Sequence, residues 1–287
     1  MAVQYGSLNV DERYSSILEP NLYHKSIFAD GMTFTSKYEI GPSGGIFVHK
    51  LGTSACTVGT PGRDFVDEAS ADTLIPIVLN NNYQKSKKIY GVQASAVAFP
   101  IATEQLEIAT QEVSEAWTNS GLGCLVTEGT ASANTATALT KSNLKAQLLA
   151  DRKAIVDAKG SADVLIMSTA TYALMLENFG SEYTPMANDV VNATGQIGKW
   201  MGFTVIEASA LSEAQFVYYD ATGTKKTTKQ PTAKNIDYIM YNHEALSIIP
   251  NFDVARIVDS ENFNGSKAQV EMNCGFKVTS APQVIVH

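Results

Sequence analysis

The four histidines are the side chains best suited to bind a metal or transfer a proton, and they are widely spaced. They are His24, His49, His243 and His287. None has a second metal-binding side chain three or four residues away, so a metal site could form only if the fold gathered distant residues. His243 follows a strand-like segment and precedes Glu244. We interpret it as a loop histidine with a hydrogen-bond partner.

The three cysteines predict neither a disulfide framework nor a structural zinc site. Cys56, Cys124 and Cys274 are an odd number, lie far apart and show no CxxC or Cys/His spacing. Cys124 is followed by Leu125 and Val126, and we interpret it as a small core residue rather than a nucleophile.

Two fragments look like parts of catalytic or cofactor motifs, but each lacks an essential feature. Residues 121–123, Gly-Leu-Gly, begin like a dinucleotide fingerprint, yet Val126 occupies the place of its third glycine. The carboxylate pair Glu104 and Glu107 falls on the polar face of a predicted helix, where we expect solvent. No GxSxG elbow or P-loop is found. We therefore predict no catalytic, metal-binding or cofactor-binding residue, and we do not expect an enzyme.

The composition is that of a globular protein with an unusually small charged fraction. The chain has 287 residues, of which 45% are hydrophobic but only 17% charged, against roughly 25% in soluble domains. Because the cores of subunit interfaces are depleted in charge, the shortfall predicts a surface that contacts other subunits. The net charge of −8 argues against a protein that tracks nucleic-acid phosphates.

No stretch approaches the ~18–20 apolar residues that cross a bilayer. The first residues have neither a basic region nor an apolar core, so no secretory signal is expected. We expect the chain to remain in the cytosol that makes it, or to leave by lysis.

The first third of the chain predicts two extended segments. Residues 1–40 carry isolated aromatics and predict an extended arm rather than a packed element. Residues 41–90 predict a long projecting hairpin, with a strand at 46–51, a Gly/Pro/Ser-rich tip and a return at 74–79, where Pro76 indicates an edge strand. This segment has too few large apolar residues to form a core of its own. It should therefore be mobile or lie on a neighbour.

The clearest helix is predicted from about 101 to 119, after Pro100 and ending at Asn119-Ser120-Gly121. One face carries an apolar stripe of Leu106, Ala109, Val113, Ala116 and Trp117. The other is acidic, with no Lys or Arg partner: Glu104, Glu107, Gln111, Glu112 and Glu115. We expect this acidic face to be solvated or to contact a positively charged surface.

Residues 125–248 alternate between helices and strands. One helix is predicted to be capped by Thr140 or Ser142 and to end at Gly160, and the next to be capped by Ser168 or Thr169 and to stop at Gly180. The predicted strands are 163–167, 203–206, 216–219 and 236–241. A long hairpin at about 250–280 follows, with a type I′ turn at Asn264-Gly265, and a last strand at 283–286.

Two lysine clusters are noted: Lys85, Lys87 and Lys88, and Lys225, Lys226 and Lys229. We interpret both as solvated loops. The alternative is pairing with an acidic surface of a neighbouring subunit, for which the helix with Glu104, Glu107 and Glu112 is a candidate.

The order of these elements resembles that of the major capsid protein of tailed bacteriophages, the Hong Kong 97-type coat fold. The resemblance covers essentially the whole chain. Its motifs are ADVLIMS at 162–168 leading into TYAL at 171–174, GFTVIEAS at 202–209, and GFKV at 275–278 followed by PQV at 282–284.

The resemblance implies an α+β capsid fold with four parts. These are an N-terminal arm at 1–40, an extended loop at 41–90, a peripheral domain at 91–124 and 249–287 with a spine helix at ~101–119 and a hairpin at ~250–280, and an axial domain at 125–248. It implies an icosahedral virion shell of pentamers and hexamers, assembled in the bacterial host cytoplasm. The implied partners are copies of the chain, a separate scaffolding protein, portal and cement proteins, and enclosed DNA bound without sequence specificity, with no membrane.

Some relatives cross-link a lysine to an asparagine with a glutamate as base. Lys50, Asn264 (or Asn262) and Glu271 lie in comparable segments, although we interpret them as surface residues without chemistry.

Two alternatives to a phage capsid protein remain open: an encapsulin nanocompartment shell, and a cytosolic α+β enzyme without a recognisable motif. Particle size and contents distinguish these classes.

Overall fold

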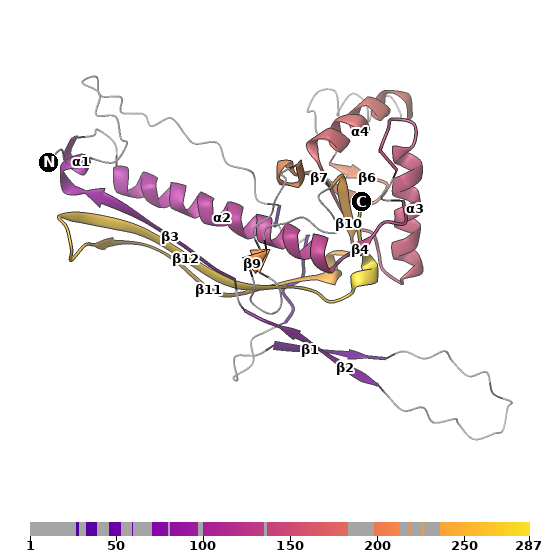
Figure 1. The fold of residues 1–287 in the computed structure, drawn as a ribbon, viewed down its shortest axis with the longest axis horizontal. Helices are drawn as coiled ribbons and strands as arrows, with labels where there is room; N and C mark the ends of the chain where they lie inside the picture. Colours follow the sequence, from indigo (N-terminus) through magenta and orange to yellow (C-terminus); the bar gives the residue numbers. More distant parts are fainter. Residues whose placement is uncertain are drawn as a thin grey trace.

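A computed structural model describes residues 27–28, 33–38, 46–52, 59, 71–79, 81–96, 100–134, 137–182, 198–212, 218–219, 225–226 and 236–287. It has three main parts: a long sheet with a helix along it, a second sheet covered by helices, and a projecting hairpin (Figure 1). His24, Cys56 and Lys229 lie outside the described residues.

The long sheet is antiparallel, in the order β11-β12-β3. Its strands are β11 (Leu246–Asp259), β12 (Gly265–Val278) and β3 (Asn81–Tyr90). The predicted alternation of β12 is confirmed, because alternate residues are buried toward helix α2: Ala268, Val270, Cys274, Phe276 and Val278. The short helix α1 (Gly91–Ala96) follows β3.

Helix α2 spans Ile101–Glu128, so the predicted end at 119–121 is wrong. Its first half packs on the long sheet through Ala109 and Val113. Its last turns bury Leu122 and Leu125 in the same core as strands of the second sheet. The helix continues past Gly121 because it joins the two sheets and fills a face of each.

The second sheet has six strands in the order β4-β13-β10-β5-β7-β6. They are β4 (Thr130–Ala131), β13 (Val284–Val286), β10 (Tyr238–Tyr241), β5 (Val164–Met167), β7 (Phe203–Glu207) and β6 (Lys199–Trp200). The pairs β5–β7 and β13–β4 are parallel and the others antiparallel. The predicted strand at 283–286 thus lies in this sheet, with elements of 125–248, and not in the sheet of the 250–280 hairpin.

Different helices pack on the two faces of the six-stranded sheet. Helices α3 (Leu144–Asp157) and α4 (Thr169–Glu182) pack on one face with Leu165 and Met240. The end of α2 packs on the other with Ile166 and Ile239. Alternate residues of β5 and β10 point to opposite cores, which is why both strands are buried throughout. The remaining short elements are η1 (Ser209–Ser212), η2 (His243–Ala245), η3 (Ala281–Gln283), β8 (Tyr218–Tyr219) and β9 (Lys225–Lys226).

Helix ends depart from the prediction at three points. Asn143, not Thr140 or Ser142, is the N-cap residue of α3, and its side chain accepts the Thr140 amide at 2.7 Å. The helix ends at Asp157, ahead of Gly160. In α4, the predicted cap Ser168 is confirmed, since its hydroxyl accepts the Thr171 amide at 3.4 Å. That helix continues past Gly180.

The turn of the long hairpin is longer than the predicted two-residue turn at Asn264-Gly265. The Ser260 amide donates to the Gly265 carbonyl at 2.9 Å, which leaves residues 261–264 as the connection. Gly265 has a φ of +153°, and a Cβ there would lie 2.0 Å from the Ile89 carbonyl oxygen of β3. Glycine is needed because a neighbouring strand passes this position closely.

The described part of residues 1–40 is packed, contrary to the prediction. Phe28 is 1% exposed and Phe34 is half-buried. The rings of both meet Trp117 edge to face, with centroids 5.8 and 6.5 Å away. Thr35 forms a parallel bridge to Ser247. Phe28 and Phe34 are therefore packed against the core that contains α2 and β11.

Strands β1 (Ile46–Leu51) and β2 (Asp72–Ile77) form the projecting hairpin. They pair antiparallel, and within the described part of the chain neither is hydrogen-bonded to a third strand, so Pro76 lies in an edge strand as predicted (Figure 1).

Candidate functional site

Within the residues that the structure describes, the side chains that could do chemistry do not converge. Among the described residues, no three or more His, Cys, Asp or Glu side chains are placed to hold a metal ion. His49 pairs with Asp72 across the β1–β2 hairpin at 2.7 Å. His243 pairs with Asp163 at 2.7 Å, which confirms the predicted partner, although His243 begins the short 3-10 helix η2 rather than lying in a loop. No helix in the described part of the chain is long and apolar enough to cross a membrane.

Cys124 and Cys274 are buried, as the core interpretation of Cys124 predicts. Burial raises the pKa of the Cys124 thiol well above its usual range, and the nearby Glu128 carboxylate raises it further. Burial raises the pKa of Cys274 to about 12. Both thiols are protonated near neutral pH and are poor nucleophiles.

The residues with a possible cross-linking role lie apart within one chain. Lys50 is exposed on β1, and Asn262 and Asn264 are exposed in the connection between β11 and β12. Glu271 lies seven residues beyond Asn264, a distance of about 23 Å along a strand. Its carboxylate accepts the amides of Asn82 and Gln84 at 3.1 and 2.7 Å, and these hydrogen bonds lower its pKa.

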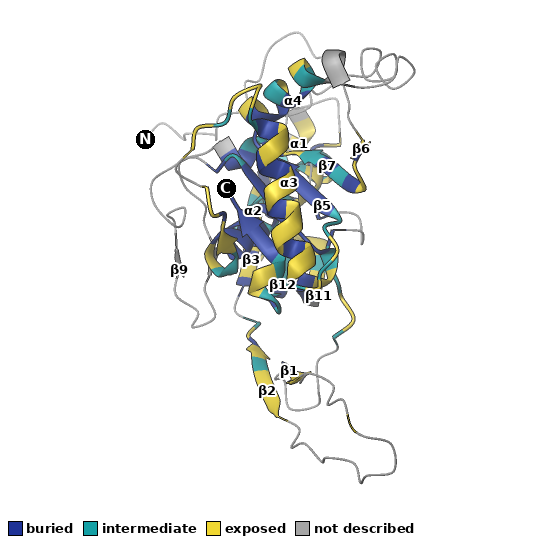
Figure 2. Cartoon of the chain, turned by 90° about the vertical axis from the view of Figure 1, so that its right-hand side faces the viewer, coloured by how far each residue is buried: buried dark blue, intermediate teal, exposed yellow. Residues whose placement is uncertain are grey.

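The β1–β2 hairpin leaves large apolar side chains uncovered. Phe47, Leu51 and Leu74 are 59%, 65% and 52% exposed. Figure 2 shows the hairpin extending away from the buried body, with β2 largely exposed. A projecting segment with exposed large apolar side chains is typical of a surface that another chain covers.

The base of this hairpin is fixed to the body. Ile46, Val48 and Ile77 form a buried cluster with Ile249 of β11. At Gly275 of β12, a Cβ would lie 2.9 Å from the Leu79 side chain. The hairpin therefore leaves the long sheet at a defined position.

The acidic face of α2 and the first lysine cluster meet within one chain. Glu112 lies 2.9 Å from Lys85 Nζ and 2.8 Å from Lys87 Nζ of β3. Burial acts to raise the pKa of Glu112, but the two lysines outweigh it and the pKa is lowered. Lys85 and Lys87 therefore lie in a strand and pair with Glu112 of their own chain, so the interpretation of this cluster as a solvated loop is wrong for these two residues. Lys225 and Lys226 lie on β9.

A second ion pair joins the end of α2 to the end of β12. The Glu128 carboxylate accepts Lys277 Nζ at 2.7 Å and the Val278 amide at 2.8 Å. This contact fixes the point where the long sheet meets the six-stranded sheet.

A buried carboxylate network fixes α3 on the six-stranded sheet. Asp151 accepts the hydroxyl of Ser132 at 2.9 Å and the hydroxyl of Tyr238. The Gln147 amide donates to Ser132 Oγ at 3.0 Å. Burial and the Asp151 carboxylate strongly raise the pKa of Tyr238, which keeps it a hydrogen-bond donor.

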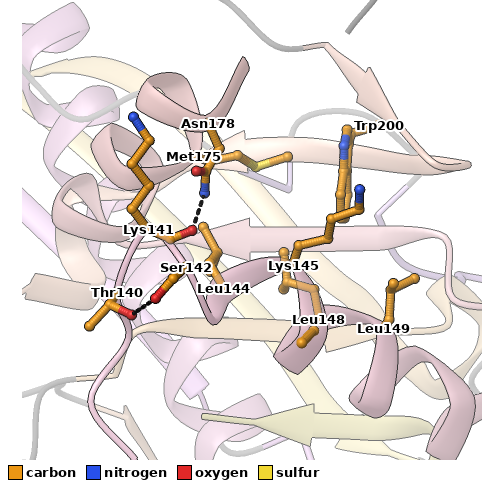
Figure 3. Close-up of a pocket in the computed structure, with 11 residues that line it drawn as sticks. Thr140, Lys141, Ser142, Leu144, Lys145, Leu148, Leu149, Met175, Asn178 and Trp200 are labelled. Atoms are coloured by element: carbon orange, nitrogen blue, oxygen red, sulfur yellow. Dashed lines mark hydrogen bonds between the residues drawn. The ribbon is translucent and has the colours of Figure 1, made fainter. Parts of the chain in front are cut away.

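Helix α3 borders a pocket of ≈ 630 Å³ with α4 and β6. Its apolar lining comes from Leu144, Leu148, Leu149, Met175 and Trp200, and Lys141 and Lys145 lie at its rim (Figure 3). The sequence predictions missed this surface, although the basic residues on the exposed side of the predicted helix could have indicated it.

No protein-family model matches the sequence, and no curated protein sequence matches it significantly. Solved structures do match. A chain from Mycobacterium phage Che8 is 16% identical with a TM-score of 0.70, covering 98% of this chain and 98% of that chain. A chain from the capsid of cyanophage P-SCSP1u is 12% identical with a TM-score of 0.71, covering 96% and 91%.

A chain from the mature capsid of bacteriophage PhiM1 has a TM-score of 0.66 at 11% identity, covering 96% of this chain and 90% of that one. These matches extend over nearly the whole length of both chains. The chain therefore has the Hong Kong 97-type coat fold of tailed-phage capsids, and the predicted fold class is confirmed.

Proposed function

We propose that this chain is the major capsid protein of a tailed double-stranded DNA bacteriophage, and that its copies assemble into the icosahedral shell of the virion. The observation that carries the proposal is the β1–β2 hairpin, whose Phe47, Leu51 and Leu74 are exposed in a single chain. The shared coat fold supports it, since the matched structures include phage capsids. A shell explains the low charged fraction, because interface cores are depleted in charge.

Each part of the fold then has a role in the shell. The β1–β2 hairpin belongs to the extended loop predicted at 41–90 and lies across the adjacent subunit, whereas β3, from the same predicted range, is a strand of the long sheet. The long sheet and most of α2 form the peripheral domain, and the six-stranded sheet with α3 and α4 forms the axial domain that closes pentamers and hexamers. The DNA is enclosed without sequence-specific binding, and scaffolding, portal and cement proteins are further partners.

Substitutions on the hairpin test the proposal. Phe47→Ser with Leu74→Ser should leave a folded subunit, because both side chains are exposed, but should reduce large assemblies at least tenfold in sedimentation velocity. The matched control, Phe47→Leu with Leu74→Met, keeps the apolar surface and should assemble. Equal assembly of the serine variant and the wild type would refute the role of the hairpin.

A further inference from the structure

The exposed side of α3 is a cationic area on an acidic chain. Residues 141–159 contain five Lys and Arg and two Asp, a formal net charge of +3. The rest of the chain has 16 Lys and Arg against 27 Asp and Glu, a net charge of −11. All five basic side chains are exposed: Lys141, Lys145, Arg152, Lys153 and Lys159. Asp151 is buried, so one of the two compensating charges is absent from the surface.

Helix α3 has a second stripe that does not face its own core. Lys145, Leu149, Arg152 and Val156 follow at spacings of four, three and four, and share one face. Leu149 and Val156 are 41% and 49% exposed. The buried stripe, with Leu148 and Ile155, lies at a different angle on the helix. In Figure 2, which views the molecule from the right-hand side of Figure 1, the exposed side of α3 faces the viewer.

The pocket beside α3 extends this stripe into an apolar recess. Its lining includes Leu148, Met175 and Trp200, with Lys145 and Leu149 shared with the stripe (Figure 3). The Arg152 guanidinium lies 6.0 Å from the centre of the Phe203 ring, and that ring stacks on Trp200 of the pocket lining.

We propose that this α3 surface, made of Lys141, Lys145, Leu149, Arg152, Lys153 and Val156 with the adjoining pocket, binds an acidic surface of a second copy of the chain. The inference deepens and rests on the proposed function, and it names one pair of complementary faces in the shell. A second copy fits because its remaining residues carry −11. Exposed apolar side chains beside cations favour a protein partner, since nucleic-acid phosphates are bound by charge and hydrogen bonds without such a recess.

Charge reversal tests the surface. Lys145→Glu with Lys153→Glu should fold like the wild type, because both side chains are exposed, yet lower the assembled fraction at least tenfold. Lys145→Arg with Lys153→Arg keeps the charge and should assemble normally. Nucleic-acid binding by the unassembled subunits is measured in parallel. If the Glu variant assembles like the wild type and loses only nucleic-acid binding, the surface binds nucleic acid and the proposal is overturned.

Cross-linking identifies the partner directly. Shells assembled from a mixture of ¹⁴N and ¹⁵N chains are treated with a zero-length carbodiimide and analysed by mass spectrometry. We expect mixed-isotope peptides that join Lys141, Lys145 or Lys153 to an Asp or Glu of another copy. Inter-copy links from other lysines but none from these would overturn the inference alone. If the wild-type chain forms no assembly, both the proposed function and this inference are overturned.

Discussion

The ring of Phe28 lies against Gly121 in the last third of α2, so closely that a Cβ at Gly121 would be 2.5 Å from Phe28 Cε2. The two residues are 93 positions apart in the sequence. This contact holds the described N-terminal residues against the helix, beside Trp117. It explains a glycine in the interior of a helix, where glycine costs about 1 kcal/mol relative to alanine.

Gly121→Ala should therefore lower the free energy of unfolding, although alanine favours helices. We expect a loss of about 1–3 kcal/mol from overpacking against the buried Phe28 ring, measured by urea denaturation of the unassembled subunit. The same substitution in a Phe28→Ala background should cost far less, because the clash is gone. An equal loss in both backgrounds would contradict the contact.

Glu112→Gln should destabilise the subunit by about 1–2 kcal/mol at pH 7, because it removes the anion held by Lys85 and Lys87. The pKa of Glu112 is lowered from its ordinary value of 4.5. Its contribution is therefore fully present above pH 4.5 and is lost as the pH falls through the lowered pKa. Glu107→Gln, at an exposed position of the same helix, is the matched control and should change little. A pH-independent difference between Glu112→Gln and wild type would refute this prediction.

Cys124 and Cys274 should resist alkylation in the folded chain. In a Cys56→Ser background at pH 8, we expect iodoacetamide to label both at least about 100-fold more slowly than in denaturant, because both pKa values are raised by burial. Mass spectrometry of timed samples gives each rate. Rapid labelling of Cys124 in the native subunit would show that the end of α2 is not packed as described.

Asp151→Ala should lower the free energy of unfolding by about 2–4 kcal/mol, since it leaves the buried hydroxyls of Ser132 and Tyr238 without their acceptor. Asp157→Ala removes the same side chain from an exposed position of α3, and a change within about 0.5 kcal/mol is expected. Chemical denaturation of both variants provides the comparison. Similar losses would mean that the network contributes nothing specific.

Local patterns were enough to predict much of the fold. The alternation of β12 follows from a strand with one face on a core, and the apolar run at 164–167 from a strand buried on both faces. The exposed hairpin followed from the scarcity of large apolar residues at 41–73. These signals depend on neighbours in the sequence.

The errors came from contacts between distant residues. Asn119-Ser120-Gly121 has the composition of a helix end, but Phe28 and the six-stranded sheet extend α2 to Glu128. The pairing of Lys85 and Lys87 with Glu112 joins a strand to a helix, and spacing along the chain cannot show it. The cationic stripe of α3 could have been found, because Lys145, Leu149, Arg152 and Val156 have helical spacing.

Electron microscopy of particles purified from cells that make the full chain tests the central claim most directly. We predict closed shells of pentamers and hexamers in which the β1–β2 hairpin of each copy lies on an adjacent copy, so that Phe47 and Leu74 become buried. Monomers or dimers of the 30.8 kDa chain, or shells in which the hairpin contacts only its own chain, would contradict the account.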